Sequence, residues 1–184
     1  MQRIQPVDAA TASPETAELL AAVKKQMGGV PRILGTMARS HAALAGYLGL
    51  AGAVSAGRLP AGLREQVALA VAGANGCDYC ASAHTVLGGM QGIAKDELAR
   101  NLRAESSDPR SAAALKFVTR VLATRGNVSD DEIAATREAG FDDEEIVELV
   151  ANTVLNVFTN YFNHVAATEI DFPVVKAGHV AKAA

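Results

Sequence analysis

The chain has 184 residues, of which 49% are apolar, 20% are charged and 4% are aromatic, and its formal net charge is -3. This size suits a single domain, and a composition without Trp leaves close packing to Ala, Leu and Val, as in helical proteins. The dispersed basic residues argue against nucleic acid as a partner, and the absence of an apolar run of about 18 residues argues against a membrane span.

The helix starts are marked by Ser, Thr, Asp or Asn placed before Pro or three residues before Glu. Ser129 with Glu132 and Asp142 with Glu145 have the capping-box spacing. In chain order we predict helices over about 14–27, a short segment from 31, then 40–56, 61–74, 77–88, 95–101, 109–125, 130–139 and 143–170. No stretch alternates apolar and polar residues as a strand would, so we expect an all-α fold.

The two cysteines, Cys77 and Cys80, stand three residues apart. This spacing cannot connect distant parts of a secreted domain, so the thiols indicate chemistry or metal binding instead of a structural disulfide. Because residues 1–15 also lack an apolar stretch of signal-peptide length, we expect a cytoplasmic protein.

His84 follows Cys80 by four residues, so on a helix Cys77, Cys80 and His84 project from one face. Both cysteines fall in the first turn after Asn75-Gly76, where unpaired N–H groups and the helix dipole lower a thiol pKa from about 8.5 to as little as 3.5–7.5. A thiolate that attacks a peroxide becomes a sulfenic acid, and a second thiol within reach converts it to a disulfide. The spacing therefore predicts a redox-active pair.

Glu65 lies on the preceding predicted helix. If the chain turns back at Gly76, the Glu65 carboxylate can approach the thiols and His84. We expect it to accept a proton or to orient the imidazole.

These four positions match the Glu-x11-Cys-x2-Cys-x3-His signature of the alkyl hydroperoxidase AhpD and of the wider carboxymuconolactone decarboxylase-like superfamily. The segments GRLPAGLREQVALAVA and NVFTNYFNHVAATEIDFP also resemble the peroxidase-related branch of this group. The resemblance covers a core of about 40–173 within a single AhpD-like domain of residues 1–184, and leaves a C-terminal tail over 174–184.

This resemblance implies an antioxidant thiol peroxidase with an all-α, internally duplicated fold, assembled as a homo-oligomer, either trimer or hexamer. It implies that Cys80 attacks the hydroperoxide, that Cys77 resolves the product, and that Glu65 and His84 form a proton relay. A lipoyl or thioredoxin-like dithiol would restore the thiols, with no cofactor and no metal. The best-known branch has His immediately before the second cysteine, whereas this sequence has Tyr79, which is a poor base at neutral pH.

A weak sequence similarity between two parts of the chain accompanies the expected duplication. A shift of 80 residues places Glu65 on Glu145 and His84 on His164, although chance agreement between two helices explains it as well. We interpret His164 as a hydrogen-bonded residue of the core or of an interface, and Tyr161 and Phe162 as packing residues.

Four alternatives remain open at this point. Cys77, Cys80, His84 and Glu65 could bind zinc, or the thiols could be inert core residues. The fold could catalyse lactone decarboxylation, although members with that activity generally lack the cysteine pair. The chain could also be a redox-sensing or chaperone-like oligomer without enzymatic activity.

Overall fold

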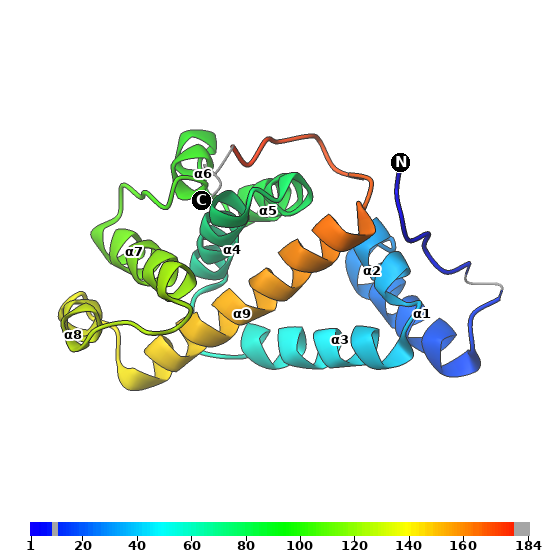
Figure 1. The fold of residues 1–184 in the computed structure, drawn as a ribbon, viewed down its shortest axis with the longest axis horizontal. Coiled ribbons are helices and arrows are strands. Elements are labelled where there is room, and N and C mark those ends of the chain that lie inside the picture. The colour runs from blue at the N-terminus through cyan, green and yellow to red at the C-terminus, as the bar shows by residue number, and fades with distance from the viewer. Residues whose placement is uncertain (9–10, 179–184) are drawn as a thin grey trace.

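The structure is a computed structural model that describes residues 1–8 and 11–178, and over these residues the chain is all-α, without a strand (Figure 1). The described helices are α1 (Pro14–Met27), α2 (Arg32–Met37), α3 (His41–Ser55), α4 (Ala61–Asn75), α5 (Asp78–Met90), α6 (Lys95–Asn101), α7 (Pro109–Thr124), α8 (Asp130–Glu138) and α9 (Asp143–Ala166). The predicted fold class is confirmed. None of these helices is long and apolar enough to cross a membrane.

Local capping sets most of the helix boundaries. Both predicted capping boxes form, at the starts of α8 and α9. The clearest difference from the prediction is the end of α9, which stops at Ala166 instead of 170. Ala167 adopts a left-handed backbone with φ 48°, and its N–H donates to the Asn163 carbonyl, which closes the last turn.

The sharp corner between α4 and α5 depends on Gly76. Its φ of +67° is left-handed, where a residue without a Cβ carries little strain. The N–H of Cys77 donates to the Ala72 carbonyl at 2.9 Å, which fastens the corner to the last turn of α4. Helices α4 and α5 therefore lie side by side, and α9 packs against both (Figure 1).

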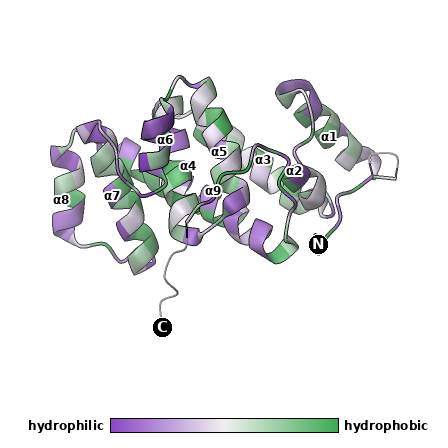
Figure 2. Cartoon of the chain, turned by 90° about the horizontal axis from the view of Figure 1, so that it is seen from above, coloured by the Kyte–Doolittle hydropathy of each residue, from purple (hydrophilic) through white to green (hydrophobic). Residues whose placement is uncertain are grey.

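Two hydrophobic clusters form the core, and α4 contributes to both. The thiol-side cluster gathers residues of α1, α2, α3 and α5, including Leu34, Leu44, Cys77 and Cys80. The α7-side cluster joins α4, α7 and α9 through fully buried residues such as Val67, Leu115, Val118 and Leu149. Figure 2 shows α4 as largely hydrophobic, whereas α6 and α8 carry hydrophilic stretches.

Residues 174–178, the first part of the predicted tail, pack on α5 of the same chain. The N–H of Val175 donates to Ser82 Oγ at 2.9 Å, and that of Ala177 donates to Asp78 Oδ1 at 3.0 Å. Lys176 forms an ion pair with Asp78 at 2.7 Å. This segment therefore fastens the chain end to the start of α5, and residues 179–184 lie outside the described part.

The expectations for α9 are met in part. His164 and Tyr161 are exposed on this chain, so neither belongs to its core, whereas Phe162 packs against the thiol-side cluster. The interface expected for His164 stays a prediction. The shift of 80 residues does not correspond to a structural repeat. It would place Gly76 on Asn156, but Gly76 ends α4 whereas Asn156 lies inside the continuous helix α9.

Candidate active site

The two cysteines meet at the start of α5. Cys77 is the N-cap residue, and its Sγ accepts a hydrogen bond from the backbone N–H of Cys80, with the two atoms 3.4 Å apart. Both side chains are free thiols and both are buried, with 1% of Cys77 and 3% of Cys80 exposed. The sequence prediction that both sulfurs occupy the opening of one helix matches this placement.

The two thiols shift each other's pKa in opposite directions. The Cys80 thiol donates to the Cys77 sulfur, and this bond, with the backbone N–H of Cys80, lowers the pKa of Cys77 despite its burial. The same bond, burial and the negative charge on Cys77 raise the pKa of Cys80. The reduced pair thus carries its first negative charge at Cys77 and keeps a proton on Cys80.

Polar side chains of α9 surround the Cys80 sulfur. Asn163 Nδ2 donates to Cys80 Sγ at 3.3 Å, and Cys80 Sγ contacts Thr159 Oγ1 at 4.0 Å. Thr159 in turn donates to the Asn156 carbonyl at 2.9 Å. The amide N–H of Asn163 can therefore stabilise negative charge on this sulfur, whereas the Thr159 hydroxyl, whose proton goes to Asn156, accepts from the neutral thiol.

Sequence analysis missed these α9 residues. Their signal was present in the spacing of Asn152, Asn156, Thr159 and Asn163, which are separated by four, three and four residues and so share one face of the helix. A polar row of this kind on an otherwise apolar helix indicates a polar environment facing it.

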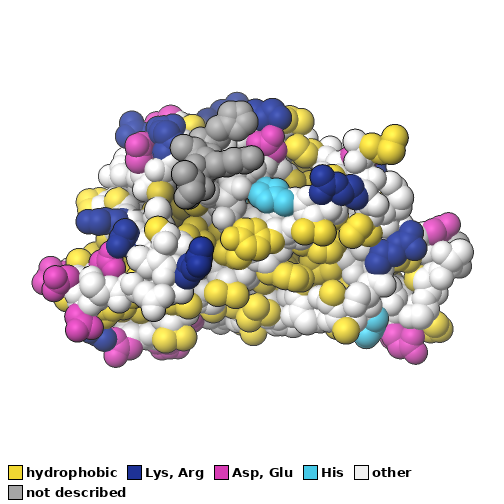
Figure 3. All heavy atoms as spheres, viewed as in Figure 1, with side chains coloured by type: hydrophobic (Ala, Val, Ile, Leu, Met, Phe, Trp, Pro, Cys, Tyr) yellow, Lys and Arg dark blue, Asp and Glu magenta, His cyan; other side chains and the backbone are white. Residues whose placement is uncertain are grey.

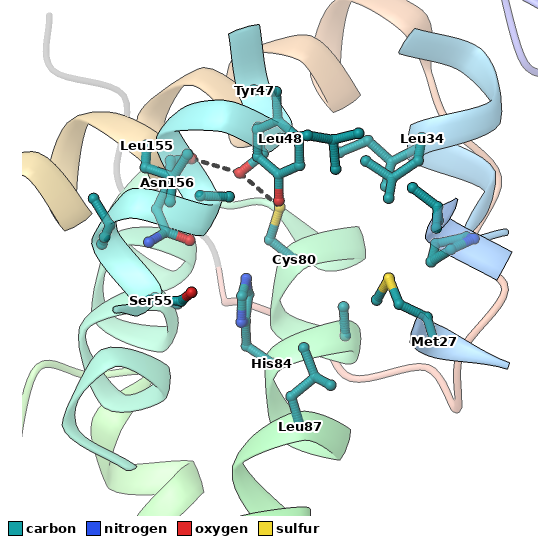
Figure 4. A pocket seen from close by; sticks show the side chains of 18 of the residues that line it. Met27, Leu34, Tyr47, Leu48, Ser55, Cys80, His84, Leu87, Leu155 and Asn156 are labelled. Atoms are coloured by element: carbon teal, nitrogen blue, oxygen red, sulfur yellow. Dashed lines mark hydrogen bonds between the residues drawn. The ribbon is translucent and has the colours of Figure 1, made fainter. Parts of the chain in front are cut away.

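Glu65 and His84 come together as the turn at Gly76 predicts. Glu65 Oε2 of α4 lies 2.8 Å from His84 Nδ1 of α5, and each side chain is 21% exposed. His84 is one helical turn beyond Cys80, and Figure 4 shows its ring directed toward that sulfur. The carboxylate can thus hold the imidazole in one orientation, which is what a proton relay requires.

A cavity of about 590 Å³ opens beside this cluster. Cys80, His84 and Glu65 line it, whereas Cys77 does not. Most of the remaining wall is apolar and comes from α1, α2, α3, α5 and α9 (Figure 4), as in Met27, Leu34, Leu48, Leu87 and Leu155. A mainly apolar wall with a few polar groups at one point is typical of a small-molecule site.

Tyr47 of α3 is a further site residue that the sequence analysis did not identify. It lines the cavity, and Figure 4 shows its hydroxyl directed toward the Cys80 sulfur. Burial, followed by the negative charges of Cys80 and Glu65, raises the pKa of Tyr47 to about 12. No hydrogen bond from this hydroxyl to a protein atom is found within residues 1–8 and 11–178, so a neutral phenol is free to donate to a molecule in the cavity.

Tyr79, which replaces the family His, has a different role. Its hydroxyl accepts a hydrogen bond from the backbone N–H of Ile33 at 3.2 Å, and its ring meets Phe172 edge-on with centroids 5.7 Å apart. Burial raises the pKa of Tyr79, so the phenol stays protonated. Tyr79 therefore fastens α2 to α5 and does not serve as a base.

The described part of the chain offers no cluster of side chains for the zinc site that the sequence left open. There, no group of three or more His, Cys, Asp or Glu side chains lies close enough together to hold a metal ion. The Glu65–His84 pair and the two cysteines form two adjacent pairs, not one tetrahedral set.

Comparison with known proteins finds a family similarity over part of the chain. Residues 40–123 match the model of the carboxymuconolactone decarboxylase family, a stretch that contains both cysteines, Glu65 and His84. No curated protein matches the sequence at a significant level.

Several solved structures share the fold. The alkylhydroperoxidase AhpD core of an uncharacterized peroxidase-related protein from Ralstonia eutropha JMP134 has a TM-score of 0.82 and 24% identity, covering 92% of each chain. An uncharacterized peroxidase-related protein from Silicibacter sp. TM1040 has a TM-score of 0.77 and 22% identity, covering 91% of this chain and 92% of the other. The debrominase Bmp8 has a TM-score of 0.76 and 18% identity, covering 91% of each chain. The chain thus has the AhpD-like helical fold, and over residues 40–123 it is similar to the carboxymuconolactone decarboxylase family.

Proposed function

We propose that this protein is a thiol peroxidase that reduces organic hydroperoxides by oxidising Cys77 and Cys80 to a disulfide. The observation that carries this proposal is the placement of a paired thiol, Cys80, on the wall of an apolar cavity beside the Glu65–His84 pair. The AhpD-like fold and the similarity of residues 40–123 to the carboxymuconolactone decarboxylase family support an enzyme of this general type.

Cys80 is the attacking residue because its sulfur, and not that of Cys77, lines the cavity. In the reduced pair, His84 accepts one of the two thiol protons, and the other stays on Cys80 in its hydrogen bond to Cys77. When this proton crosses to Cys77, the Cys80 thiolate is free to attack the terminal oxygen of the hydroperoxide. Asn163 stabilises that thiolate through its hydrogen bond.

The attack forms an S–O bond and breaks the O–O bond, so Cys80 becomes a sulfenic acid and an alkoxide leaves. Tyr47 donates its phenolic proton to the alkoxide and regains one from His84. A phenol with a pKa of about 12 is a stronger acid than the alcohol it forms, so this transfer is favourable.

The second step joins the sulfurs. His84 accepts the remaining proton from Cys77, and the Cys77 thiolate attacks the Cys80 sulfur. The S–S bond forms, the S–O bond breaks, and the departing hydroxide takes the proton from His84 to leave as water. The hydroperoxide is reduced to an alcohol and water, and a dithiol, lipoyl or thioredoxin-like, is then required to restore the pair.

The test mixes pre-reduced protein with a limiting amount of cumene hydroperoxide and counts free thiols over time. Wild type should lose two thiols per peroxide, and Cys77→Ser should stop at a sulfenic acid on Cys80. Cys80→Ser should consume no peroxide above the background rate. If wild type reacts no faster than Cys80→Ser, the proposed reaction is wrong.

A second candidate is reductive debromination, since Bmp8 shares the fold and the same cavity could hold a small apolar bromide. A solved structure of a cysteine-to-alanine form of Bmp8 holds 2,3,4-tribromopyrrole. Here Cys77 and Cys80 would supply two electrons and two protons, replacing bromine by hydrogen and releasing bromide. Incubation of reduced protein with that pyrrole, followed by bromide release, tests this reaction separately.

Lactone decarboxylation also stays a candidate, because the family model that matches residues 40–123 bears that name. This reaction is redox-neutral and needs no thiol, so the Cys77→Ser, Cys80→Ser double variant should keep the activity. Loss of activity in the double variant would reject the decarboxylase candidate.

A further inference from the structure

The cavity beside Cys80 has two ends of different chemistry. Figure 4 shows the Cys80 sulfur between them, with Ser55 and Asn156 on one side. Met27 and Leu34 lie on the other side. The first two side chains are polar and the second two are apolar. A molecule that fits both ends is therefore itself polar at one end and apolar at the other, and it passes the reactive sulfur.

The polar end lies where α3, α4 and α9 meet. Ser55 is the last residue of α3, and Arg64 lies one turn into α4. Asn152 lines the cavity from α9, whose exposed side is apolar. Arg64 Nη1 donates to the Leu59 carbonyl, which places its guanidinium beside the connection that follows Ser55. Among the described residues of the cavity wall, Arg64 is the one Lys or Arg.

Most side-chain donors of Arg64 have no partner within residues 1–8 and 11–178. The bond to the Leu59 carbonyl is the one hydrogen bond of its guanidinium there, and it forms no ion pair in that part of the chain. A guanidinium carries five N–H donors in a planar fork that matches the two oxygens of a carboxylate. Because the side chain is half-buried and lines the cavity, these donors are available to an anion that enters it.

The two carboxylates nearest to Arg64 along the cavity and the α3–α4 connection have other partners. Glu65, the next residue of α4, lies 2.8 Å from His84 Nδ1. Glu148 of α9 does not line the cavity, and it accepts from two backbone N–H groups of the α3–α4 connection at 2.8 and 2.9 Å. The charge of Arg64 is therefore left for an anionic ligand to compensate.

The opposite end of the cavity suits a hydrocarbon chain. Gln26 also lines this end but is exposed. Helices α1 and α2 supply most of the wall with aliphatic side chains, namely Leu19, Ala22, Val23, Met27, Ile33 and Leu34. Burying a chain of CH₂ groups there contributes binding free energy in proportion to the apolar area removed from water.

The surface of the protein does not supply a general attraction for anions. The net charge is -3, and Figure 3 shows Lys and Arg side chains spread over one face with Asp and Glu among them. A surface of this kind does not concentrate negatively charged molecules. A preference for an acid over an uncharged analogue therefore has to come from Arg64 inside the cavity.

We propose that the substrate is the hydroperoxide of a long-chain carboxylic acid, with its carboxylate on Arg64 and its hydrocarbon end between α1 and α2. This inference rests on the proposed function and names the substrate class of the same site. The hydroperoxide group lies between the two ends, in front of Cys80. It is reduced to a hydroxy acid and water while Cys77 and Cys80 become a disulfide. Arg64 determines specificity and takes no part in the bond changes.

The first measurement does not depend on peroxidase activity. Isothermal titration calorimetry compares the binding of decanoate and decanol to the reduced, full-length protein. Arg64→Gln keeps a donor for the Leu59 carbonyl but removes the charge, so it should weaken decanoate binding about ten-fold and leave decanol unchanged. Lys25→Gln removes the same charge from an exposed position of α1 that does not line the cavity, and should bind both as wild type does.

The second measurement compares linoleic acid hydroperoxide with its methyl ester in stopped-flow thiol loss. Wild type should react about ten-fold faster with the acid, and Arg64→Gln should react with both at the rate of the ester. Cumene hydroperoxide, which has no carboxylate, should react equally with both proteins. Circular dichroism reports whether each variant folds. If Arg64→Gln does not fold, Ser55→Asp decides, because a carboxylate at the polar end should weaken decanoate binding by a similar factor.

The two measurements separate two kinds of failure. Equal decanoate affinity in wild type and Arg64→Gln overturns the carboxylate site, whether or not the protein reduces peroxides. Equal rates of wild type with the acid and the ester overturn the substrate class. If decanoate binding depends on Arg64 but no hydroperoxide is consumed, the carboxylate site stands and the peroxidase function is wrong.

Discussion

The two hydrophobic clusters that share α4 are packed differently. The α7-side cluster consists of aliphatic and aromatic side chains, and Leu115, Val118 and Leu149 have no exposed surface. The thiol-side cluster contains two thiols and borders a cavity of about 590 Å³. One side of α4 is therefore packed by hydrocarbon side chains alone, whereas the other side keeps the open volume that chemistry requires.

The largest expected effect is on the free energy of unfolding, when a leucine is replaced by alanine on each side of α4. Leu115→Ala should destabilise the protein by about 3 kcal/mol, because a close-packed site cannot collapse around the lost side chain. Leu155→Ala enlarges an existing cavity and should cost less than about 1 kcal/mol. Urea unfolding of both variants gives the comparison, and equal losses would contradict it.

The next effect concerns the proton relay. His84→Gln and Glu65→Gln should each slow peroxide-dependent thiol oxidation, with His84→Gln lowering the rate about 100-fold, since positioned acid–base groups contribute that much or more. His41→Gln, an exposed histidine at the start of α3, is the control. Stopped-flow thiol loss measures the rates, and a wild-type rate in His84→Gln would remove that residue from the mechanism.

A smaller effect is expected at Tyr47. Tyr47→Phe should slow reaction with cumene hydroperoxide about ten-fold, the equivalent of one hydrogen bond. Peracetic acid releases acetate, which leaves without a proton, so with this oxidant the variant should approach wild type. Tyr161→Phe removes an exposed hydroxyl as the control. An equal loss with both oxidants would indicate a structural role for Tyr47.

The smallest effect is a pH dependence of the thiols. Ultraviolet thiolate absorbance should rise in two steps, one below and one above the ordinary pKa of about 8.5. Because folding lowers the pKa of Cys77, this thiol stabilises the folded protein at pH values above its pKa in the unfolded chain. That stabilisation is lost as the pH falls through the pKa of Cys77 in the folded protein. Because folding raises the pKa of Cys80, this thiol stabilises the folded protein at pH values below its pKa in the unfolded chain. That stabilisation is lost as the pH rises through the pKa of Cys80 in the folded protein. Cys80→Ala should move the lower step upward, because Cys77 loses its thiol donor.

Sequence patterns predicted the helices well where local interactions decide them. Capping residues such as Ser129 and Asp142 act within one turn, so they fix helix starts whatever packs around them. The predicted end of α9 was wrong, because a left-handed Ala167 has no signature in residue type. The thiol and imidazole spacing placed Cys77, Cys80 and His84 on one face of a helix, and a single glycine was enough to predict that Glu65 turns back toward them.

What the sequence determined by itself was the set of helices and the chemically reactive residues at the α4–α5 corner. Only the tertiary structure decided which sulfur lines the cavity, that Tyr47 and Asn163 approach Cys80 from α3 and α9, and that α9 turns its apolar side outward. Helix formation and capping depend on residues three or four apart, whereas these contacts join residues more than 30 positions apart. Their geometry depends on how the helices pack, which a local pattern does not contain.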